Sequence, residues 1–422
     1  MRRIASAFLL FLWATLAAAG AEWQGLDVPN VPSMGSGASG VRFQSFTIPA
    51  HARVVLIGDS ITAARGFAGY GDWILFEADG KFYPKVVGSN GTGPTGWNQG
   101  VVGNTSAQVI ARLSNVSAEN PRAVGFGVGT NDIGTGAATA AQICANYDTI
   151  IASIVAAGAK PFAWTVIPRT SAGWSGAQEA DRQSVRSCLL AKLPAAQVVD
   201  SDTVITDTVN QLMADGTHPN GTGAQLLGNA LWAKMQPFFS SDSILPTSPP
   251  SSPANLYANP FFTGGATVAT SWTFFQNTNG LTKAASKTTV DGYEAQRYVA
   301  SGTATANVAD NFNQTVTPPG GLAGDLYEAW VEVLVTKATG ITGIAISAGT
   351  NNTNATHMSI TSQDSGTLTV PFRGVMRAPP SVLASDGGNF NSRISFLPAN
   401  GATVDADITL LRANYRKVPT GQ

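Results

Sequence analysis

The sequence predicts two domains: an α/β domain with a parallel sheet covered by helices on both faces, and then an all-β sandwich of the jelly-roll kind. Between residues 53 and 239, short apolar runs alternate with stretches of helical length, which is the pattern of a parallel α/β sheet. After residue 254 helix signals vanish, and short alternating runs lie between Gly, Asn and Pro turns, as in antiparallel sandwiches. A chain of 422 residues is also too long for one ordinary core.

The elements of the first domain follow from apolar runs and helix caps. The run at residues 54–57 stops at Gly58 and predicts a buried strand, because Val, Leu and Ile bounded by Gly favour the interior of a parallel sheet. Further strands are predicted at 85–89, 123–128, 160–167 and 197–200, with an edge strand at 41–48. Helices are predicted at 105–113, where Thr105 or Asn104 is the N-cap, and at 138–157, 176–193 and 222–239.

A change of composition separates the two domains. Residues 243–253 are rich in Pro and Ser and predict an extended linker, which leaves the first domain at 22–242 and the sandwich at 254–422. Within the sandwich, strands are predicted at 293–299, 311–316, 326–335, 341–347, 357–361, 367–372, 392–397 and 405–411.

The N-terminus has the layout of a secretory signal peptide. Arg2 and Arg3 precede an apolar run at 4–19, and small residues at 17–21 offer cleavage sites. A membrane anchor fits less well, because the run is short for a span. We therefore expect residues 1–21 to be removed and the mature chain to be secreted or periplasmic, without a membrane span.

The composition is that of a globular protein with few charges. Hydrophobic residues make up 44% of the chain, charged residues only 12%, and the net charge is −1. Loss of Arg2 and Arg3 with the leader lowers the net charge to −3. No basic stripe is present that would recruit nucleic acid or anionic lipid, so we expect neither as a partner.

Ser60 is the candidate nucleophile. It follows the first predicted strand directly after Gly58 and Asp59, at the carboxyl end where open α/β sheets place their ligands. A serine in such a turn can project its Oγ into a cleft, while its own N–H faces developing negative charge. Taken alone, the tripeptide fits a helix cap better than a nucleophile.

Asp215 and His218 lie in one turn just before the last predicted helix. Their spacing lets the carboxylate accept the proton on one ring nitrogen of His218 and leave the other nitrogen to accept a proton from serine. A surface turn with an ordinary histidine is the simpler interpretation of this segment alone. However, the only other histidine of this domain is His51, which precedes the first strand.

Two further residues could donate hydrogen bonds to an oxyanion. Gly103 ends a glycine-containing loop and can present its backbone N–H without a side chain in the way, and Asn131 follows the third strand with a side-chain amide. Considered separately, both are ordinary turn residues.

Together these segments resemble a known family. Gly58-Asp59-Ser60, Gly103 before Asn104-Thr105-Ser106, Gly129-Thr130-Asn131-Asp132, and Asp215 with His218 occur in the order of the sequence blocks of the SGNH (GDSL-type) hydrolases. The resemblance covers residues 53–239, and its one departure is Ile61 in place of the Leu of the GDSL name.

The resemblance implies a role for each candidate residue. Ser60 would be the nucleophile, His218 the base and Asp215 its orienting partner, with Ser60 N–H, Gly103 and Asn131 as the oxyanion hole. It also implies a three-layer α/β/α fold with a five-stranded parallel sheet, and chemistry that needs no metal or organic cofactor.

The two cysteines, Cys144 and Cys188, form no CxxC pair and no metal-binding cluster with histidine. Both fall in predicted helices that follow consecutive strands, and such helices can lie side by side on one face of a sheet. The residues therefore leave two alternatives open, a disulfide in an oxidising compartment or two separate buried thiols.

The second domain resembles the jelly-roll carbohydrate-binding modules in short segments at 255–262, 324–327 and 405–408. Trp330 lies on the more polar side of a predicted strand, together with Glu328 and Glu332. It is the candidate glycan contact, and a core position is the equally open alternative.

The leading hypothesis is a secreted serine esterase that removes acetyl or other small acyl groups from a polysaccharide, while the second domain holds the polymer. Its substrate would be an acylated polysaccharide or a small ester. Two alternatives are a general short-chain esterase or lipase, and a surface glycan-binding protein with a vestigial hydrolase domain. Acyl transfer to a sugar hydroxyl also stays open, and the sequence predicts no oligomeric state.

Overall fold

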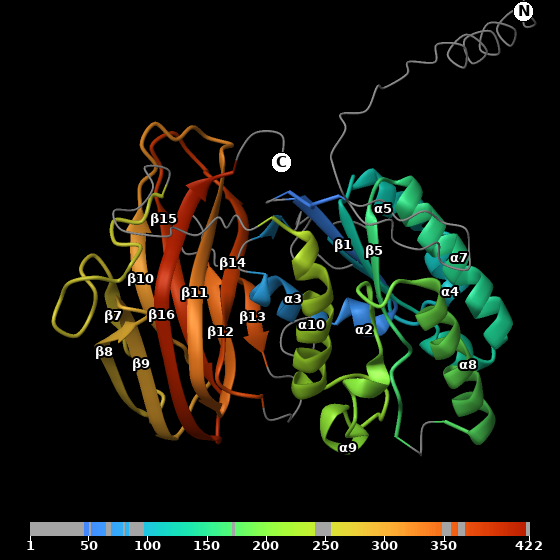
Figure 1. Ribbon diagram of the computed structural model, residues 1–422. Coiled ribbons are helices and arrows are strands. Elements are labelled where there is room, and N and C mark those ends of the chain that lie inside the picture. Colours follow the sequence, from blue (N-terminus) through green and yellow to red (C-terminus); the bar gives the residue numbers. More distant parts are fainter. Residues whose placement is uncertain are drawn as a thin grey trace, which may run out of the picture. The chain divides into compact units, whose positions relative to one another are not determined.

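Figure 1 shows the computed structural model of the chain. It describes residues 46–49, 52–64, 69–78, 81–83, 97–170, 174–240, 255–347, 356–361 and 368–418. The predicted signal peptide at 1–21, the linker at 243–253 and the strand at 85–89 lie outside the described residues, as does most of the predicted edge strand at 41–48. Of that edge strand, Ile48 forms an isolated parallel bridge with Phe239.

The first domain is built on a parallel sheet in the order β2-β1-β4-β5-β6, with β3 also paired to β1. β2 and β3 lie one after the other along the same side of β1 and together form one edge of the sheet: β2 pairs with the start of β1 and β3 with its end. β4 pairs with the other side of β1. The predicted five-stranded parallel sheet is therefore confirmed, with one position shared by two short strands. The bounds are β1 (Ala52–Gly58), β2 (Phe82–Tyr83), β3 (Asn98–Gly100), β4 (Ala123–Gly127), β5 (Lys160–Trp164) and β6 (Val198–Val199).

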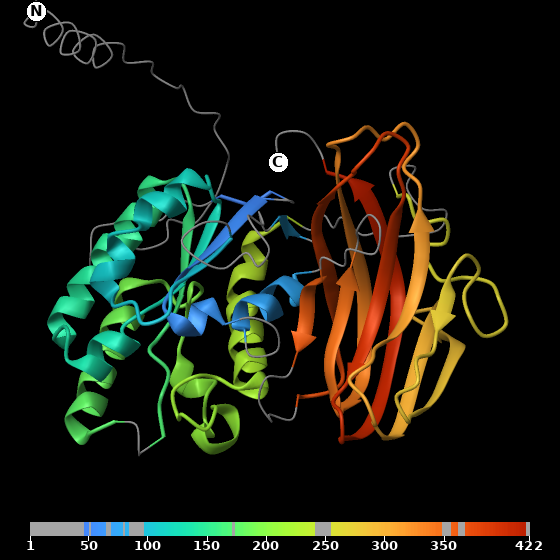
Figure 2. The same ribbon diagram turned by 180° about the vertical axis from the view of Figure 1, so that it is seen from behind.

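Helices cover both faces of this sheet (Figures 1 and 2). Side chains alternate along a strand, so Val54 and Leu56 pack with one group of helices, and Val55 and Ile57 with the other. The first group is α2 (Ser60–Ala63), α3 (Tyr70–Glu77) and α10 (Gly221–Met235); the second is α4 (Ser106–Ile110), α5 (Leu113–Ala118), α7 (Ala140–Ala156) and α8 (Gly176–Lys192). This is the expected α/β/α arrangement. Helix α3 and the short helices α5, α6 (Thr130–Thr135) and α9 (Thr208–Gln211) were not predicted.

Three of the described helices begin at capping boxes, in which a Ser or Thr and a Gln three residues later bond each other's backbone N–H. Thr105 caps α4 in this way, which confirms one of the two predicted caps. Thr139 and Ser175 do the same for α7 and α8. The predicted starts at 138 and 176 therefore agree with the observed starts to within two residues.

A disulfide joins α7 and α8. Cys144 and Cys188 are bonded, with their Cα atoms 6.0 Å apart. The helices lie side by side on one face of the sheet, as Figure 1 shows. Of the two alternatives that the sequence left open, the structure therefore has the bridge.

The second domain is a sandwich of two antiparallel sheets, in the orders β13-β12-β15-β10-β7 and β14-β11-β16-β9-β8. The quartets β13-β12-β15-β10 and β14-β11-β16-β9 have jelly-roll connections, as predicted, and β7 and β8 extend one edge of each. The bounds are β7 (Thr273–Phe275), β8 (Thr282–Val290), β9 (Tyr293–Thr303), β10 (Asp310–Val316), β11 (Leu326–Thr339), β12 (Ile341–Ser347), β13 (Thr356–Thr361), β14 (Phe372–Val382), β15 (Phe390–Pro398) and β16 (Thr403–Lys417).

Two features of the sandwich differ from the sequence prediction. β7 and β8 were not predicted, because their sequences contain few apolar residues in alternation. The strand predicted at 367–372 is wrong, since β14 begins only at Phe372, which pairs with Val335. Pro371, directly before it, has no N–H to donate to a ladder.

The sequence offered Trp330 as a candidate glycan contact, and the structure corrects this expectation because the residue is buried. The ring is only 1% exposed, and the Arg377 guanidinium lies 4.9 Å from its centre. Its neighbour Glu328 is fully buried and bonds Arg377 and Arg416. Burial alone would raise the pKa of Glu328, but the two arginines outweigh it and lower the pKa. The polar side of this strand is thus an internal ion-pair network rather than a sugar platform.

Among the helices of the described segments, none combines the length and the apolar character that a membrane crossing requires.

Candidate active site

Ser60 lies at the first residue of α2, directly after β1. Asp59 is the N-cap, and its Oδ1 accepts a hydrogen bond of 3.0 Å from Ile61 N. Gly58 permits the tight turn, since a Cβ there would lie 2.2 Å from Thr62 Oγ1 and 2.6 Å from Gly127 O. The end of β1 therefore presents Ser60 at the edge of the sheet where the parallel strands have their carboxyl ends.

The turn that carries Asp215 and His218 is held by its own backbone. Gly216 has a φ of +64°, which favours glycine. Asp215 Oδ1 accepts hydrogen bonds from Thr217 N at 2.9 Å and from His218 N at 3.0 Å, so the carboxylate and the imidazole have a fixed relative position. Met213 N also bonds His218 O at 2.7 Å, which closes the turn.

The structure brings Ser60, His218 and Asp215 into one chain of hydrogen bonds. His218 Nε2 lies 2.7 Å from Ser60 Oγ, and His218 Nδ1 lies 2.5 Å from Asp215 Oδ2. Partial burial would raise the pKa of Asp215, but the hydrogen bonds from His218 and Thr217 outweigh it and lower the pKa. Asp215 is therefore ionised at neutral pH and fixes the His218 tautomer that has its proton on Nδ1.

Gly103 and Asn131 are joined through Asn104. Asn131 Nδ2 donates a hydrogen bond of 2.9 Å to Asn104 O, the residue directly after Gly103. An amide nitrogen has two hydrogens, so this bond leaves one for a ligand. Gly103 has a φ of +77°, and a Cβ there would meet nothing within 4 Å, so its backbone conformation rather than crowding explains the glycine.

A buried pair of residues fixes α6, which carries Asn131, against the start of α4. Asp132 Oδ2 accepts from Ser106 N at 2.8 Å, and Asp132 Oδ1 from Ser106 Oγ at 2.6 Å. Asn146 of α7 donates to the same Ser106 Oγ at 2.8 Å. Asp132 and Ser106 both belong to the family-like sequence segments, but their pairing depends on tertiary contacts and was not predicted.

Arg112 is a positioning residue that sequence reasoning missed. Its guanidinium donates to Gly58 O at 2.8 Å, to Gln99 O at 2.7 Å and to Asn104 Oδ1 at 2.9 Å. The first carbonyl lies two residues before Ser60, and the other two acceptors flank Gly103. One cation therefore connects the two loops that carry these residues.

Replacement of Arg112 by methionine is expected to lower kcat for a small ester about 10- to 100-fold with KM within about twofold, because small displacements of aligned groups have effects of this order. The matched control is Arg53→Met at the opposite end of β1. It removes one hydrogen bond, which the Arg53 guanidinium donates to Glu119 O at 3.0 Å. Assays are made well below both melting temperatures. Equal kcat values for the two variants would contradict the positioning role.

Asp59 is a buried carboxyl next to Ser60. It is fully buried, and its Oδ2 has no hydrogen-bond partner in the described part of the chain. Burial raises its pKa from 3.8 to about 7, while the bond from Ile61 N acts in the opposite direction. Because the folded-state pKa lies above that of the unfolded chain, stability falls as the pH rises from about 4 to about 7.

Asp59→Asn is expected to remove this pH dependence. The variant should match the parent near pH 4 and be more stable at pH 8 by up to about 4 kcal/mol, since each pKa unit corresponds to about 1.4 kcal/mol. Denaturant unfolding at both pH values measures the difference. The control Asp207→Asn changes an exposed carboxyl whose pKa is lowered by hydrogen bonds from Asn210, so it should not stabilise at pH 8. A gain for Asp59→Asn that does not vary with pH would contradict the assignment.

Trp97 and Trp164 are not open platforms. Trp97 is 1% exposed and Trp164 is fully buried, and both belong to the core between the sheet, α3 and α10. Within the described ranges, no three His, Cys, Asp or Glu side chains gather as a group that could hold a metal ion.

Comparison with known proteins identifies a family for the first domain. Residues 56–226 match the model of the GDSL-like lipase/acylhydrolase family, and this part of the chain is a domain of that type. No curated protein matches the chain.

Several solved structures are similar to the chain. The lipase/acylhydrolase from Enterococcus faecalis is 23% identical, with 44% of this chain and 96% of that chain covered and a TM-score of 0.35. A carbohydrate esterase family 3 structure from Talaromyces cellulolyticus is 23% identical, with 44% and 97% covered and a TM-score of 0.35. Axe2, an acetylxylan esterase from Geobacillus stearothermophilus, is 16% identical, with 47% and 100% covered and a TM-score of 0.36.

Proposed function

We propose that this chain, whose residues 56–226 form a GDSL-like lipase/acylhydrolase domain, is an exported serine esterase that removes acetyl or other small acyl groups from a polysaccharide. The observation that carries the proposal is the hydrogen-bond chain from Ser60 Oγ through His218 to Asp215. This arrangement of hydroxyl, imidazole and carboxylate is the one that nucleophilic acyl transfer requires.

In the first half of the reaction, Ser60 Oγ attacks the ester carbonyl and its proton moves to His218 Nε2. Asp215 accepts the Nδ1 hydrogen bond and stabilises the imidazolium that forms. The N–H groups of Ser60 and Gly103 and the remaining N–H of Asn131 donate to the oxyanion. Collapse of the intermediate breaks the bond to the alcohol oxygen, which leaves with the proton from His218.

In the second half, water attacks the acyl group on Ser60. His218 takes a proton from that water, and the same three donors hold the second oxyanion. Collapse releases the carboxylic acid and returns the proton to Ser60 Oγ. The cycle balances without an oxidant, a reductant or a further reactant.

The exposure of the site supports a substrate ester whose alcohol part is bulky and whose acyl group is small. The His218 side chain is 32% exposed and that of Asp215 47%, so the reacting groups lie at an open surface. A polymer can approach such a site from outside, whereas a long acyl chain would need an apolar channel to cover it.

Two features support export. The N-terminal sequence has the layout of a signal peptide. The disulfide between Cys144 and Cys188 is typical of proteins in oxidising compartments.

The test compares the chain without residues 1–21 and its Ser60→Ala variant on an aryl acetate, an aryl decanoate and acetylated xylan. We expect the parent to prefer the acetate ester by at least about 100-fold in kcat/KM and to release acetate from the polymer, and the variant to do neither. Preference for the decanoate with no acetate from the polymer would instead identify a lipase. Absence of any Ser60-dependent hydrolysis would leave a glycan-binding protein.

A further inference from the structure

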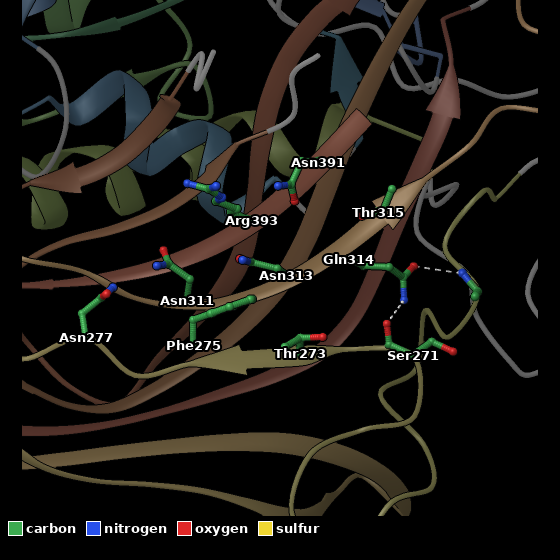
Figure 3. Close-up of a pocket in the computed structure, with 11 residues that line it drawn as sticks. Ser271, Thr273, Phe275, Asn277, Asn311, Asn313, Gln314, Thr315, Asn391 and Arg393 are labelled. Atoms are coloured by element: carbon green, nitrogen blue, oxygen red, sulfur yellow. Dashed lines mark hydrogen bonds between the residues drawn. The ribbon is translucent and has the colours of Figure 1, made fainter. Parts of the chain in front are cut away.

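The sandwich carries a polar cleft of about 680 Å³ on the face that β7, β10 and β15 turn away from the core (Figure 3). Eleven residues line it, and four of them are asparagines. The side chains that the argument uses are Thr273, Phe275, Asn311, Asn313, Asn391 and Arg393.

The cleft follows from the alternation of side chains along the strands. On β10, Phe312 points into the sandwich core, while Asn311 and Asn313 point to the other face. The strand register places Asn313 between Thr273 of β7 and Arg393 of β15. Neighbouring strands are about 4.8 Å apart, so the polar rows extend roughly 10 Å across the sheet.

The walls of the cleft are fixed by hydrogen bonds. Gln314 Oε1 accepts from Ala258 N at 3.0 Å, and Gln314 Nε2 donates to Ser271 O at 3.0 Å, as the dashed lines in Figure 3 show. Asn311 Oδ1 accepts from Ser395 Oγ at 2.6 Å. The cleft is therefore formed before a ligand arrives, and binding would require little ordering of these groups.

Asn313 and Phe275 have interaction capacity that the described residues of the cleft do not use. Asn313 Oδ1 is buried and accepts no hydrogen bond from the described residues, which is costly unless a ligand or water supplies a donor. Phe275, on the neighbouring strand, is 51% exposed, so part of an aromatic residue meets solvent beside the amides.

We infer that this cleft binds a polysaccharide chain made of uncharged sugar rings. An amide offers a donor and an acceptor side by side, which suits the adjacent hydroxyls of a sugar. An exposed aromatic ring suits the apolar face of the same sugar. The residues that line the cleft include no carboxylate and a single arginine, so neither a polycation nor a polyanion is favoured. This inference depends on the proposed function only for the choice of polymer.

The site differs from the one expected at Trp330. Trp330 lies in the other sheet and is buried, whereas the cleft combines an exposed ring with unused hydrogen-bonding capacity. Glycan binding here would keep an open active site near its polymer without a change in the chemical step.

The test uses the full chain with Ser60→Ala, so that no probe is consumed, in native electrophoresis through gels that contain xylan, glucomannan or mixed-linkage β-glucan. At least one polymer should retard the protein, and Phe275→Ala and Asn313→Ala should each weaken that retention at least about tenfold. The matched control is Tyr293→Ala, which removes an aromatic ring that is 50% exposed on the other sheet. It should leave retention unchanged.

Hydrolysis of an aryl acetate by the same variants with Ser60 intact distinguishes this inference from the proposed function. We expect turnover to be unchanged, since no residue of the cleft belongs to the active site, and melting temperatures to agree within a few degrees. No retention on any of the three polymers, or equal retention of parent and cleft variants, would overturn the inference even if the esterase activity stands. Loss of retention in Tyr293→Ala alone would also overturn it and would place the site on the other sheet.

Discussion

Ser60→Ala is expected to lower kcat/KM for every ester that the protein hydrolyses by at least about 10⁵-fold, because the variant lacks the atom that forms the acyl-enzyme. His218 Nε2, now 2.7 Å from Ser60 Oγ, would have no hydroxyl to activate. Only the residual catalysis by the oxyanion donors would remain, since they can still polarise a bound carbonyl.

Initial rates with an aryl acetate measure this effect, and reaction with a fluorophosphonate followed by mass spectrometry provides a second readout. The parent should gain one phosphonyl group on Ser60 and the variant none. The control Ser184→Ala removes a hydroxyl that bonds Ala180 O at 2.9 Å within α8, and should retain full activity. A Ser60→Ala variant with more than about a hundredth of the parent rate would refute the nucleophile assignment.

Asp215→Asn is expected to lower kcat by about 10⁴-fold with little loss of stability. The asparagine Oδ1 can still accept from Thr217 N and His218 N, so the turn should keep its shape. Its Nδ2, however, would donate to His218 Nδ1, where the carboxylate now accepts at 2.5 Å. The imidazole would then carry its proton on Nε2, and it could no longer take the proton of Ser60.

The matched control for this variant is Asp207→Asn. Asp207 is also an exposed carboxylate that accepts from a backbone N–H, that of Asn210 at 3.2 Å, but it contacts no histidine. Comparable losses of activity in the two variants would point to a general effect of the charge. A large loss confined to Asp215→Asn, with unchanged denaturant midpoints, would support the tautomer argument.

Local sequence patterns predicted much of the fold. The apolar run of β1, the length of α7 and the cap at Thr105 are properties of neighbouring residues, and all three were predictable for that reason. Short elements were missed, because α6 and β7 have too few residues to establish a period and are held by contacts distant in the sequence.

The candidate site shows the same division. Ser60, Asp215 and His218 could be named from the sequence, since two of them share one turn and the third ends a strand. Arg112 could not, because its three acceptors lie up to 54 residues away and are carbonyl and amide oxygens that no sequence pattern marks. Only the pairing of β3 with β1, and the packing of β1 against α4 and α5, bring these acceptors to one guanidinium.

The sequence by itself thus determined the layers, the order of the domains and the candidate reactive side chains, because these follow from residue type and local spacing. The tertiary structure decided which polar faces are buried. Trp330 and Asn313 both lie on strands beside polar residues, yet Trp330 is buried with the Arg377 guanidinium against its ring, while Asn313 lines a surface cleft. Burial depends on what the rest of the chain packs against a face, and a strand's own pattern does not contain that information.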